Sequence, residues 1–309
     1  MRRLSLTLIL TILAATTAAT ADASLRDRIR ARMAERFDKQ IAKDKIGGGR
    51  DIAYGADPLQ HLSFWGPTAG SNGGPAPLVV FVHGGGWKRG DIESATGRAK
   101  LAHYPGEGYA FASVNYRLVP DATVEQQATD VASAVAWLIT HARELNVDPR
   151  HIVLMGHSAG AHLVALVGTD PAYLKAVGLS EGTLAGVVLI DGAAYDVARQ
   201  MSIGAPLMGQ TYQQTFGTDP ARQKALSPTL QAAAPNAPAF LILHVQRRDG
   251  IEQAKALAAA LKANGTAVQI NDFPGAGLKG HMEINRSLGD PAYPATAVVD
   301  AWLKARFAS

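Results

Sequence analysis

Short apolar runs alternate with segments of helical periodicity along most of the chain after residue 50. Runs rich in Val, Ile, Leu and Phe predict strands at 78–82, 110–115, 151–155, 186–190, 239–245 and 267–273. Several are apolar throughout, which is typical of strands buried on both faces. Segments 124–141 and 250–263 have the spacing of helices. This alternation predicts an α/β fold, with a mainly parallel central sheet and helices on both faces.

The longest interval between predicted strands is 192–236, where glycine and proline are scattered. Such an interval could form a small lid over one end of the sheet. Alternatively, it contains a crossover helix with irregular flanks. We expect one large α/β domain over residues 51–309, in which 192–236 is the candidate lid.

The first 23 residues have a different pattern. Met1-Arg2-Arg3 is basic, 4–15 is apolar, and 16–23 is small and rich in alanine. This layout predicts a secretory signal peptide, removed near Ala21 or Ala23, and therefore an exported protein that is periplasmic or secreted. The alternative is an uncleaved membrane anchor, but a spanning helix needs roughly 20 apolar residues, so stable membrane insertion is not expected.

Residues 24–50 carry an excess of positive charge that accounts for the net charge of the chain. Nine Lys and Arg stand there against four Asp and Glu, and apolar residues recur every fourth position at Leu25, Ile29, Met33, Phe37 and Ile41. The spacing predicts a basic amphipathic helix followed by a linker. It could lie on a membrane surface or pack as a leader helix on its own domain.

Composition narrows the class of protein further. The net charge is +4, but the chain after residue 50 is close to −2, so a basic nucleic-acid-binding face is not expected. There is no cysteine, so an exported chain must be stable without disulfides. With 47% hydrophobic residues over 309 positions, the chain can bury a large core.

A candidate nucleophile follows the run at 151–155, in Gly156-His157-Ser158-Ala159-Gly160. A sharp turn from strand to helix exposes the serine hydroxyl and leaves room only for glycine two positions before and after it. A glycine-rich structural turn is the alternative. The strand before and the helical segment after the motif favour a nucleophile at Ser158.

A glycine run follows the strand predicted at 78–82, in His83-Gly84-Gly85-Gly86-Trp87. Three glycines leave the backbone free to direct N–H groups at a developing oxyanion. Phosphate binding is the competing interpretation, but neither G-x-G-x-x-G nor a G-K-[ST] ending is present.

Serine needs a general base, and the base needs a group that orients it. Functional groups of open α/β sheets gather past the carboxyl ends of the strands. Of the nine histidines, His281 lies in the loop past the last predicted strand, and we expect it to be the base. The loop after 239–245 contains Asp249, which we expect to be the acid, with Glu252 as the fallback. Alternatively, Asp249 is only an ion-pair partner of the adjacent arginines.

With these residues, the chain resembles the α/β-hydrolase superfamily, and in particular its small serine esterases with an H-G-G-G oxyanion loop. The resemblance covers roughly residues 60–305 and includes the stretch Ser113 to Leu118, Asp130, Trp137 and Asp148-Pro149-Arg150. The order Ser158, Asp249, His281 is also the order expected of that superfamily.

The resemblance implies hydrolysis of carboxylic esters of small to medium acyl chain through an acyl-serine intermediate, without a metal or organic cofactor. It implies that the N–H groups of Gly85, Gly86 and Ala159 bind the oxyanion. We expect Trp87 and His157 to contribute to substrate binding, with Tyr195 and Tyr212 near the pocket.

Two features leave the substrate open. Trp87 makes the loop similar to that of kynurenine formamidases and some feruloyl-esterase-like enzymes, and His157 stands where many H-G-G-G esterases have aspartate. An arylformamidase with the same triad is therefore an alternative function. A non-catalytic binding protein on a hydrolase scaffold is a third, although each triad position has a candidate residue. The sequence does not predict the oligomeric state.

Overall fold

The computed structural model describes residues 48–68, 74–233 and 235–308, together with Arg28. The signal peptide predicted at 1–23 and almost all of the amphipathic segment at 24–50 lie outside these residues. Residues 46–309 form one compact unit. None of the described helices is long and apolar enough to span a membrane.

An eight-stranded sheet is the centre of this unit, with the strand order β1-β2-β4-β3-β5-β6-β7-β8. Its strands are β1 (Arg50–Ala53), β2 (His61–Trp65), β3 (Ala76–Val82), β4 (Ala110–Val114), β5 (Val147–His157), β6 (Gly186–Ile190), β7 (Ala239–Gln246) and β8 (Ala267–Ala276). Strands β3 to β8 pair in parallel, whereas β1 and β2 are antiparallel. The predicted α/β class, with its mainly parallel sheet, is confirmed.

Six strands coincide with the apolar runs, whereas β1 and β2 were not predicted. In β2 only Leu62 and Phe64 are buried, so the strand has a two-residue alternation over five positions and no continuous apolar run. Strand β8 also differs from expectation, because it is the last strand of the sheet and most of its residues are exposed or half-buried.

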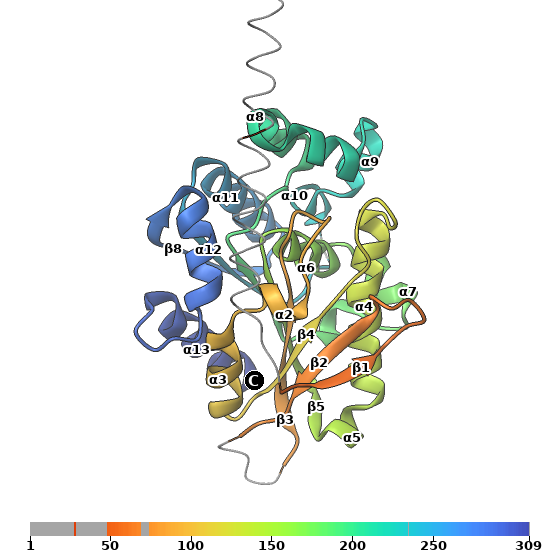
Figure 1. Cartoon of the computed structure of the whole chain (residues 1–309), viewed down its shortest axis with the longest axis vertical. Coiled ribbons are helices and arrows are strands. Elements are labelled where there is room, and N and C mark those ends of the chain that lie inside the picture. The colour runs from red at the N-terminus through yellow and green to blue at the C-terminus, as the bar shows by residue number, and fades with distance from the viewer. Residues whose placement is uncertain (1–27, 29–47, 69–73, 234, 309) are drawn as a thin grey trace, which may run out of the picture. The chain divides into compact units, whose positions relative to one another are not determined.

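The helices cover both faces of the sheet (Figure 1). They are α2 (Ile92–Ala95), α3 (Arg98–Gly106), α4 (Val124–Thr140), α5 (Ala142–Leu145), α6 (Ala159–Thr169), α7 (Pro171–Ala176), η1 (Glu181–Thr183), α8 (Val197–Phe216), α9 (Pro220–Ala225), α10 (Pro228–Gln231), α11 (Arg248–Ala263), α12 (Gly277–Ser287) and α13 (Pro294–Phe307). The predicted segments 124–141 and 250–263 correspond to α4 and α11. The candidate lid, 192–236, folds as α8, α9 and α10.

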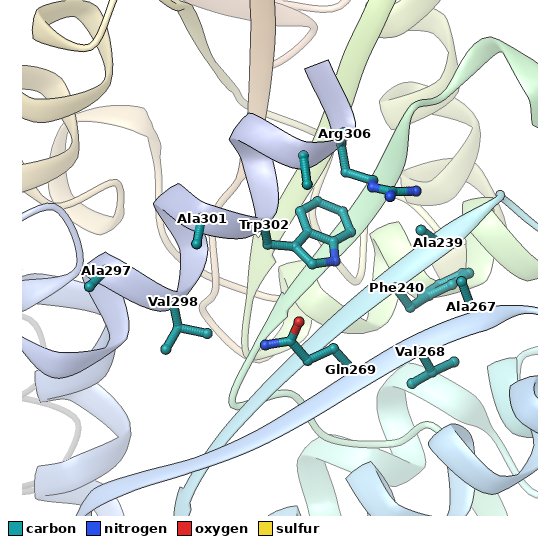
Figure 2. Close-up of a pocket in the computed structure, with 11 residues that line it drawn as sticks. Ala239, Phe240, Ala267, Val268, Gln269, Ala297, Val298, Ala301, Trp302 and Arg306 are labelled. Atoms are coloured by element: carbon teal, nitrogen blue, oxygen red, sulfur yellow. The ribbon is translucent and has the colours of Figure 1, made fainter. Parts of the chain in front are cut away.

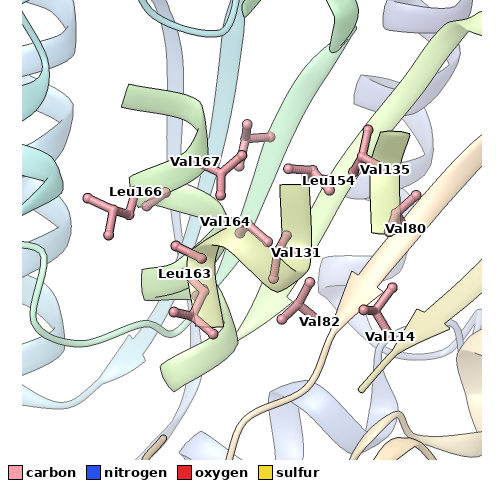
Figure 3. Close-up of a cluster of buried hydrophobic side chains, with 14 of the residues drawn as sticks. Val80, Val82, Val114, Val131, Val135, Leu154, Leu163, Val164, Leu166 and Val167 are labelled. Atoms are coloured by element: carbon pink, nitrogen blue, oxygen red, sulfur yellow. The ribbon is translucent and has the colours of Figure 1, made fainter. Parts of the chain in front are cut away.

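Two apolar cores hold the helices against the sheet. In β3, Val80 and Val82 point into the core shared with α4 and α6, whereas Val79 and Phe81 point into the core shared with α3, α12 and α13. Figure 3 shows the first core, where α4 and α6 supply Val131 and Leu163. Every residue of α6 is buried, so the helix after Ser158 is fixed by its surroundings on all sides.

Candidate active site

Ser158 lies at the turn between β5 and α6, in a strained backbone conformation. Its φ is 55° and its ψ is −117°, a region that costs a residue with a side chain on the order of 1–3 kcal/mol. Its N–H donates to the carbonyl oxygen of Ile190 at 3.1 Å, which joins the turn to β6. The structure therefore has the nucleophile turn predicted from the sequence.

Glycine is required on both sides of this turn because backbone atoms approach too closely for a side chain. A Cβ atom on Gly156 would lie 2.4 Å from the carbonyl oxygen of Gly160. A Cβ atom on Gly160 would lie 2.1 Å from the carbonyl oxygen of Val82. Both distances are far inside van der Waals contact.

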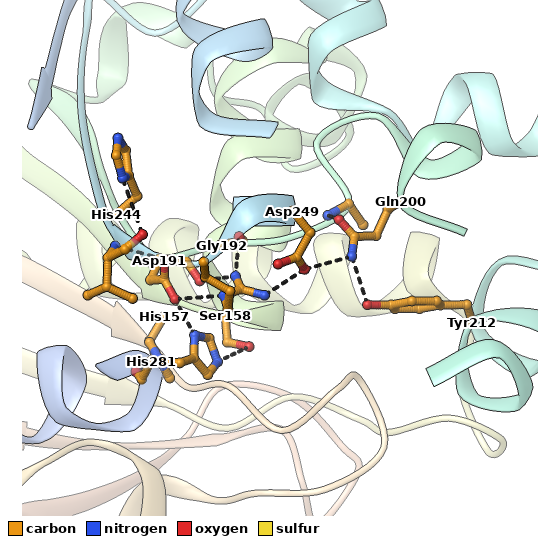
Figure 4. Close-up of polar contacts among 12 residues, drawn as sticks. His157, Ser158, Asp191, Gly192, Gln200, Tyr212, His244, Asp249 and His281 are labelled. Atoms are coloured by element: carbon orange, nitrogen blue, oxygen red, sulfur yellow. Dashed lines mark hydrogen bonds and ion pairs between the residues drawn. The ribbon is translucent and has the colours of Figure 1, made fainter. Parts of the chain in front are cut away.

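His281 joins Ser158 to a buried carboxylate (Figure 4). Its Nε2 lies 3.0 Å from Oγ of Ser158, and its Nδ1 lies 2.5 Å from Oδ2 of Asp191. An ionised carboxylate only accepts hydrogen bonds, so Nδ1 carries the proton and Nε2 is left to accept from the serine hydroxyl. This arrangement can remove the serine proton. His281 lies in the first half of α12, and not in a loop as the sequence predicts.

The carboxylate that hydrogen-bonds to His281 belongs to Asp191, so the prediction of Asp249 as the acid is wrong. Asp191 follows β6 directly, and its side chain is fully buried. Asp249 instead accepts hydrogen bonds from Nη1 of Arg247 at 2.7 Å and from Nε2 of Gln200 at 3.1 Å. The fallback, Glu252, is paired with Arg199 at 3.0 Å. The alternative interpretation, in which Asp249 is an ion-pair partner of a neighbouring arginine, is the one observed.

The signal for Asp191 was present in the sequence. Functional side chains are expected just past the carboxyl ends of the strands, and Asp191 comes directly after the predicted strand 186–190. That strand lies next to the one that carries Ser158, so the two residues are neighbours at the same edge of the sheet.

Several donors keep the Asp191 carboxylate charged inside the protein. Oδ1 accepts from the N–H of Val245 at 3.2 Å, and Oδ2 accepts from Nε of Arg247 at 3.1 Å. Burial raises the pKa of Asp191, but the hydrogen bond and charge of His281, with the charge of Arg247, outweigh burial and hold the pKa well below its usual range. The acid is therefore ionised at neutral pH.

The sequence predicts that His157 and Trp87 contribute to substrate binding, but both side chains are buried. Nε2 of His157 donates to the carbonyl oxygen of His281 at 3.0 Å, and its ring lies 4.5 Å from the ring of His281, centre to centre. Burial, followed by the charge of His281, holds the pKa of His157 well below its usual range. His157 is thus a neutral donor that supports the backbone of His281.

Trp87 anchors the end of the glycine loop. Its Nε1 donates to Nδ1 of His162 on α6 at 3.2 Å, and its ring packs on the edges of Tyr212 and Phe216 from α8. Tyr195 and Tyr212 are also buried. Trp87 therefore joins the loop to α6 and α8, and none of these three aromatic side chains forms an exposed pocket wall.

The glycine loop reaches the nucleophile. A Cβ atom on Gly84 would lie 3.0 Å from Cβ of Ser158, so the backbone of the loop is in contact with the turn. Gly85 and Gly86 follow at φ values of 134° and 63°, which favour glycine. Ala159 is the first residue of α6, where an N–H has no acceptor within its own helix. Ala159 thus adjoins Ser158, and Gly85 and Gly86 directly follow the glycine that contacts it.

Lys100 ties the helix of His281 to α3. Its buried Nζ donates to the carbonyl oxygen of Thr96 at 2.9 Å, and to Oδ1 of Asn285 at 2.9 Å and the carbonyl oxygen of the same residue. Nζ also lies 4.9 Å from the ring centre of Phe81. Asn285 is one helical turn after His281, so this ammonium group fixes the part of α12 that carries the base.

A surface groove lies at the opposite end of the sheet from Ser158. Its volume is about 590 Å³, and its walls include Ala239 and Val268 at the amino ends of β7 and β8, with Val298, Trp302 and Arg306 from α13 (Figure 2). It contains none of the residues around Ser158. Within the described part of the chain, no group of three or more histidine or acidic side chains is arranged to hold a metal ion.

Comparison with known proteins agrees with this geometry. Residues 67–261 match the model of the BD-FAE family. The chain is a member of the BD-FAE family. It has the α/β-hydrolase fold. The α/β-hydrolase resemblance predicted from the sequence is confirmed.

The relatives of this BD-FAE family member include named esterases. Esterase LipC of Mycobacterium tuberculosis is 32% identical over 245 residues, which are 74% of this chain and 59% of LipC. The probable carboxylic ester hydrolase LipM of the same organism is 28% identical over 66% of this chain and 49% of LipM. The chain therefore spans about half to three-fifths of these relatives.

Solved structures have the same fold. Esterase B of Lactobacillus rhamnosis, with a C6-C4 SN3 inhibitor, matches with a TM-score of 0.73 and 24% identity over 93% of this chain and 96% of its own. The esterase Est2 of Thermogutta terrifontis, with butyrate bound, matches with a TM-score of 0.66 and 25% identity over 83% of this chain and 94% of its own.

The close contact at Gly160 leads to the first prediction. We expect Gly160→Ala to lower the free energy of unfolding by about 1–3 kcal/mol, because the new methyl group displaces the backbone of β3 from α6. Urea denaturation followed by circular dichroism measures the loss. The control is Gly106→Ala in α3, where a Cβ atom would meet nothing within 4 Å. Equal stability of both variants would contradict the prediction.

Burial of Lys100 leads to a second prediction, because it lowers the pKa of this residue from 10.5 to about 7. Between these two values the unfolded chain binds more protons than the folded one, so folding stability rises with pH. Relative to Lys100→Met, the free energy of unfolding of the wild type should rise by up to ~1.4 kcal/mol per pH unit over that window.

Urea unfolding at several pH values from 7 to 10 measures this difference. The exposed Lys255→Met on α11 is the control, and its curve should run parallel to that of the wild type. A Lys100→Met curve that is also parallel would contradict a lowered pKa at Lys100.

Proposed function

We propose that this protein is a serine esterase that hydrolyses carboxylic esters of small to medium acyl chain through an acyl-serine intermediate. The hydrogen-bonded series Ser158, His281, Asp191 is the observation that carries the proposal. The names of its relatives support it, since LipC is an esterase and the Est2 structure has bound butyrate.

The first half of the reaction forms the acyl-enzyme. Nε2 of His281 takes the proton of Ser158 as Oγ attacks the ester carbonyl carbon, and Asp191 stabilises the imidazolium ion. The N–H groups of Gly85, Gly86 and Ala159 bind the negative oxygen of the tetrahedral intermediate. One such donor is typically worth roughly 2.7–4 kcal/mol. His281 then gives its proton to the leaving alcohol.

Water completes the reaction by the same steps. His281 removes a proton from a water molecule, the hydroxide attacks the acyl-serine carbonyl, and a second tetrahedral intermediate forms. Its collapse releases the carboxylic acid and returns the proton to Oγ of Ser158. These steps need protein groups and water alone.

Helix α8, in the candidate lid 192–236, lies against the glycine loop. Cε of Met208 and Cγ2 of Thr211, both on α8, lie 3.6 and 4.0 Å from the place of a Cβ atom on Gly86. Helix α8 therefore covers the oxyanion loop directly, and we infer that 192–236 is the lid of the site.

We also propose that the protein is exported, on the basis of the N-terminal pattern at residues 1–23. Expression from its own start codon, cell fractionation and N-terminal sequencing test this proposal. A mature chain that begins after Ala21 or Ala23 outside the cytoplasm is expected, and an uncleaved cytoplasmic chain would contradict it.

The activity itself is tested with p-nitrophenyl esters from acetate to decanoate. We expect kcat/KM to peak at short or medium chains, and Ser158→Ala to remove turnover while the protein stays folded. N-formylkynurenine is assayed alongside. Turnover of this formamide alone would favour an arylformamidase, and absence of turnover on all substrates would favour a binding protein.

The identity of the acid is tested with a matched pair of variants. We expect Asp191→Asn to lower kcat about 10³–10⁴-fold, because an amide cannot stabilise the imidazolium ion or hold the required tautomer. Asp249→Asn should lower kcat less than about tenfold, since it does not touch His281. A larger loss in Asp249→Asn than in Asp191→Asn would contradict this assignment.

A further inference from the structure

Arg247 lies between two carboxylates, those of Asp191 and Asp249. Its Nε donates to Oδ2 of Asp191 at 3.1 Å, and its Nη1 donates to Oδ2 of Asp249 at 2.7 Å. Its Nη2 donates to the carbonyl oxygens of Asp191 at 3.3 Å and Gly192 at 3.0 Å. The guanidinium group is largely buried, so each contact has a fixed geometry.

The contact with Asp191 bears directly on the base. Oδ2 of Asp191 accepts from Arg247 and from Nδ1 of His281, while Oδ1 accepts from the N–H of Val245. Both carboxylate oxygens are therefore held, and Arg247, which also donates to the carbonyl oxygen of Asp191, restrains the rotation of the carboxylate. A carboxylate free to rotate would release the imidazole from its position against Ser158.

We propose that Arg247 is a positioning residue for the esterase reaction. It holds the Asp191 carboxylate in the plane that His281 requires. Its positive charge, partly balanced by Asp249, opposes a second positive charge on the imidazole of His281. This proposal rests on the proposed function, because it concerns the same serine, histidine and acid.

The charge argument depends on every group that faces Asp191 and His281. Arg247 disfavours a second positive charge on the nearby imidazole, and Asp249 reduces this effect because it is the counter-ion of Arg247. The other titratable groups around the pair are His157, Lys100, Tyr195 and Tyr293. These four are unchanged in the variants below, so a difference between variants reports Arg247 and Asp249 alone.

Removing the two charges should therefore have opposite effects. Arg247→Met removes a positive charge, so we expect the acid limb of the kcat/KM profile to move to higher pH by about half a unit to one unit. Asp249→Asn removes the counter-ion, so we expect that limb to move to lower pH. A purely structural loosening of the site would not give shifts of opposite sign.

A third variant separates geometry from charge. Arg247→Lys keeps the positive charge but loses the planar fork, so we expect the acid limb to stay in place while kcat falls by about tenfold or more. The matched control is Arg248→Met. Arg248 is exposed, and its side chain forms an ion pair with Glu252 on α11. Its profile should equal that of the wild type.

The experiment measures pH profiles of kcat and kcat/KM for the four variants, together with an NMR titration of the His281 imidazole. Shifts of opposite sign in Arg247→Met and Asp249→Asn support the proposal, as does loss of kcat in a folded Arg247→Lys. Shifts of the same sign, or profiles and rates that equal those of Arg248→Met, would overturn it. If Arg247→Met does not fold, the proposal is judged on the other two variants. Loss of kcat in Arg247→Lys and a shift to lower pH in Asp249→Asn then support it, and the absence of both overturns it.

The NMR titration separates this proposal from the proposed function. Absence of ester turnover in the wild type would contradict the esterase, whereas the His281 resonances of the variants would still report the effect of Arg247. An active wild type in which Arg247→Met and Asp249→Asn leave the His281 titration unchanged would contradict the role of Arg247 only.

Discussion

The buried carboxylate of Asp191 is the group on which the rest of the site depends. A charge this far from water is stable only if its oxygens are paired, and here a backbone N–H, an imidazole and a guanidinium supply the partners. These partners come from β7, α12 and the residue just before α11. The acid thus joins three elements of the fold as well as orienting His281.

The strain at Ser158 is maintained by packing rather than by the turn itself. A positive φ persists only where the surroundings leave no other conformation. Here α6 is buried along its whole length, and Gly160 lies against the carbonyl oxygen of Val82 in β3. The same contact brings the end of β3 close to the nucleophile, which places the glycine loop beside Ser158.

The sequence predicted Ser158 and His281 correctly because each has a distinctive position. Ser158 stands in a G-x-S-x-G motif between a strand and a helix, and His281 follows the last predicted strand. The prediction of the acid was wrong, because the order of residues along the chain does not show which carboxylate points toward His281. Asp249 follows β7 in the expected order, yet Arg247 binds it and holds it away from His281. Likewise, β2 was not predicted because only Leu62 and Phe64 are buried, and burial of so short a strand depends on its partners.

Two largely buried basic side chains, Lys100 and Arg247, hold the surroundings of His281 in different ways. Lys100 stabilises α12 through carbonyl and amide oxygens of Thr96 and Asn285, so its hydrogen bonds set the place of the imidazole. Arg247 contacts the acid itself, and it shares Oδ2 of Asp191 with Nδ1 of His281. Because Asp249 also binds Gln200 of α8, the charge near the acid is linked to the helix that covers Gly86. A movement of α8 would therefore displace both the hydrogen-bond partner of Asp249 and the side chains that lie against Gly86.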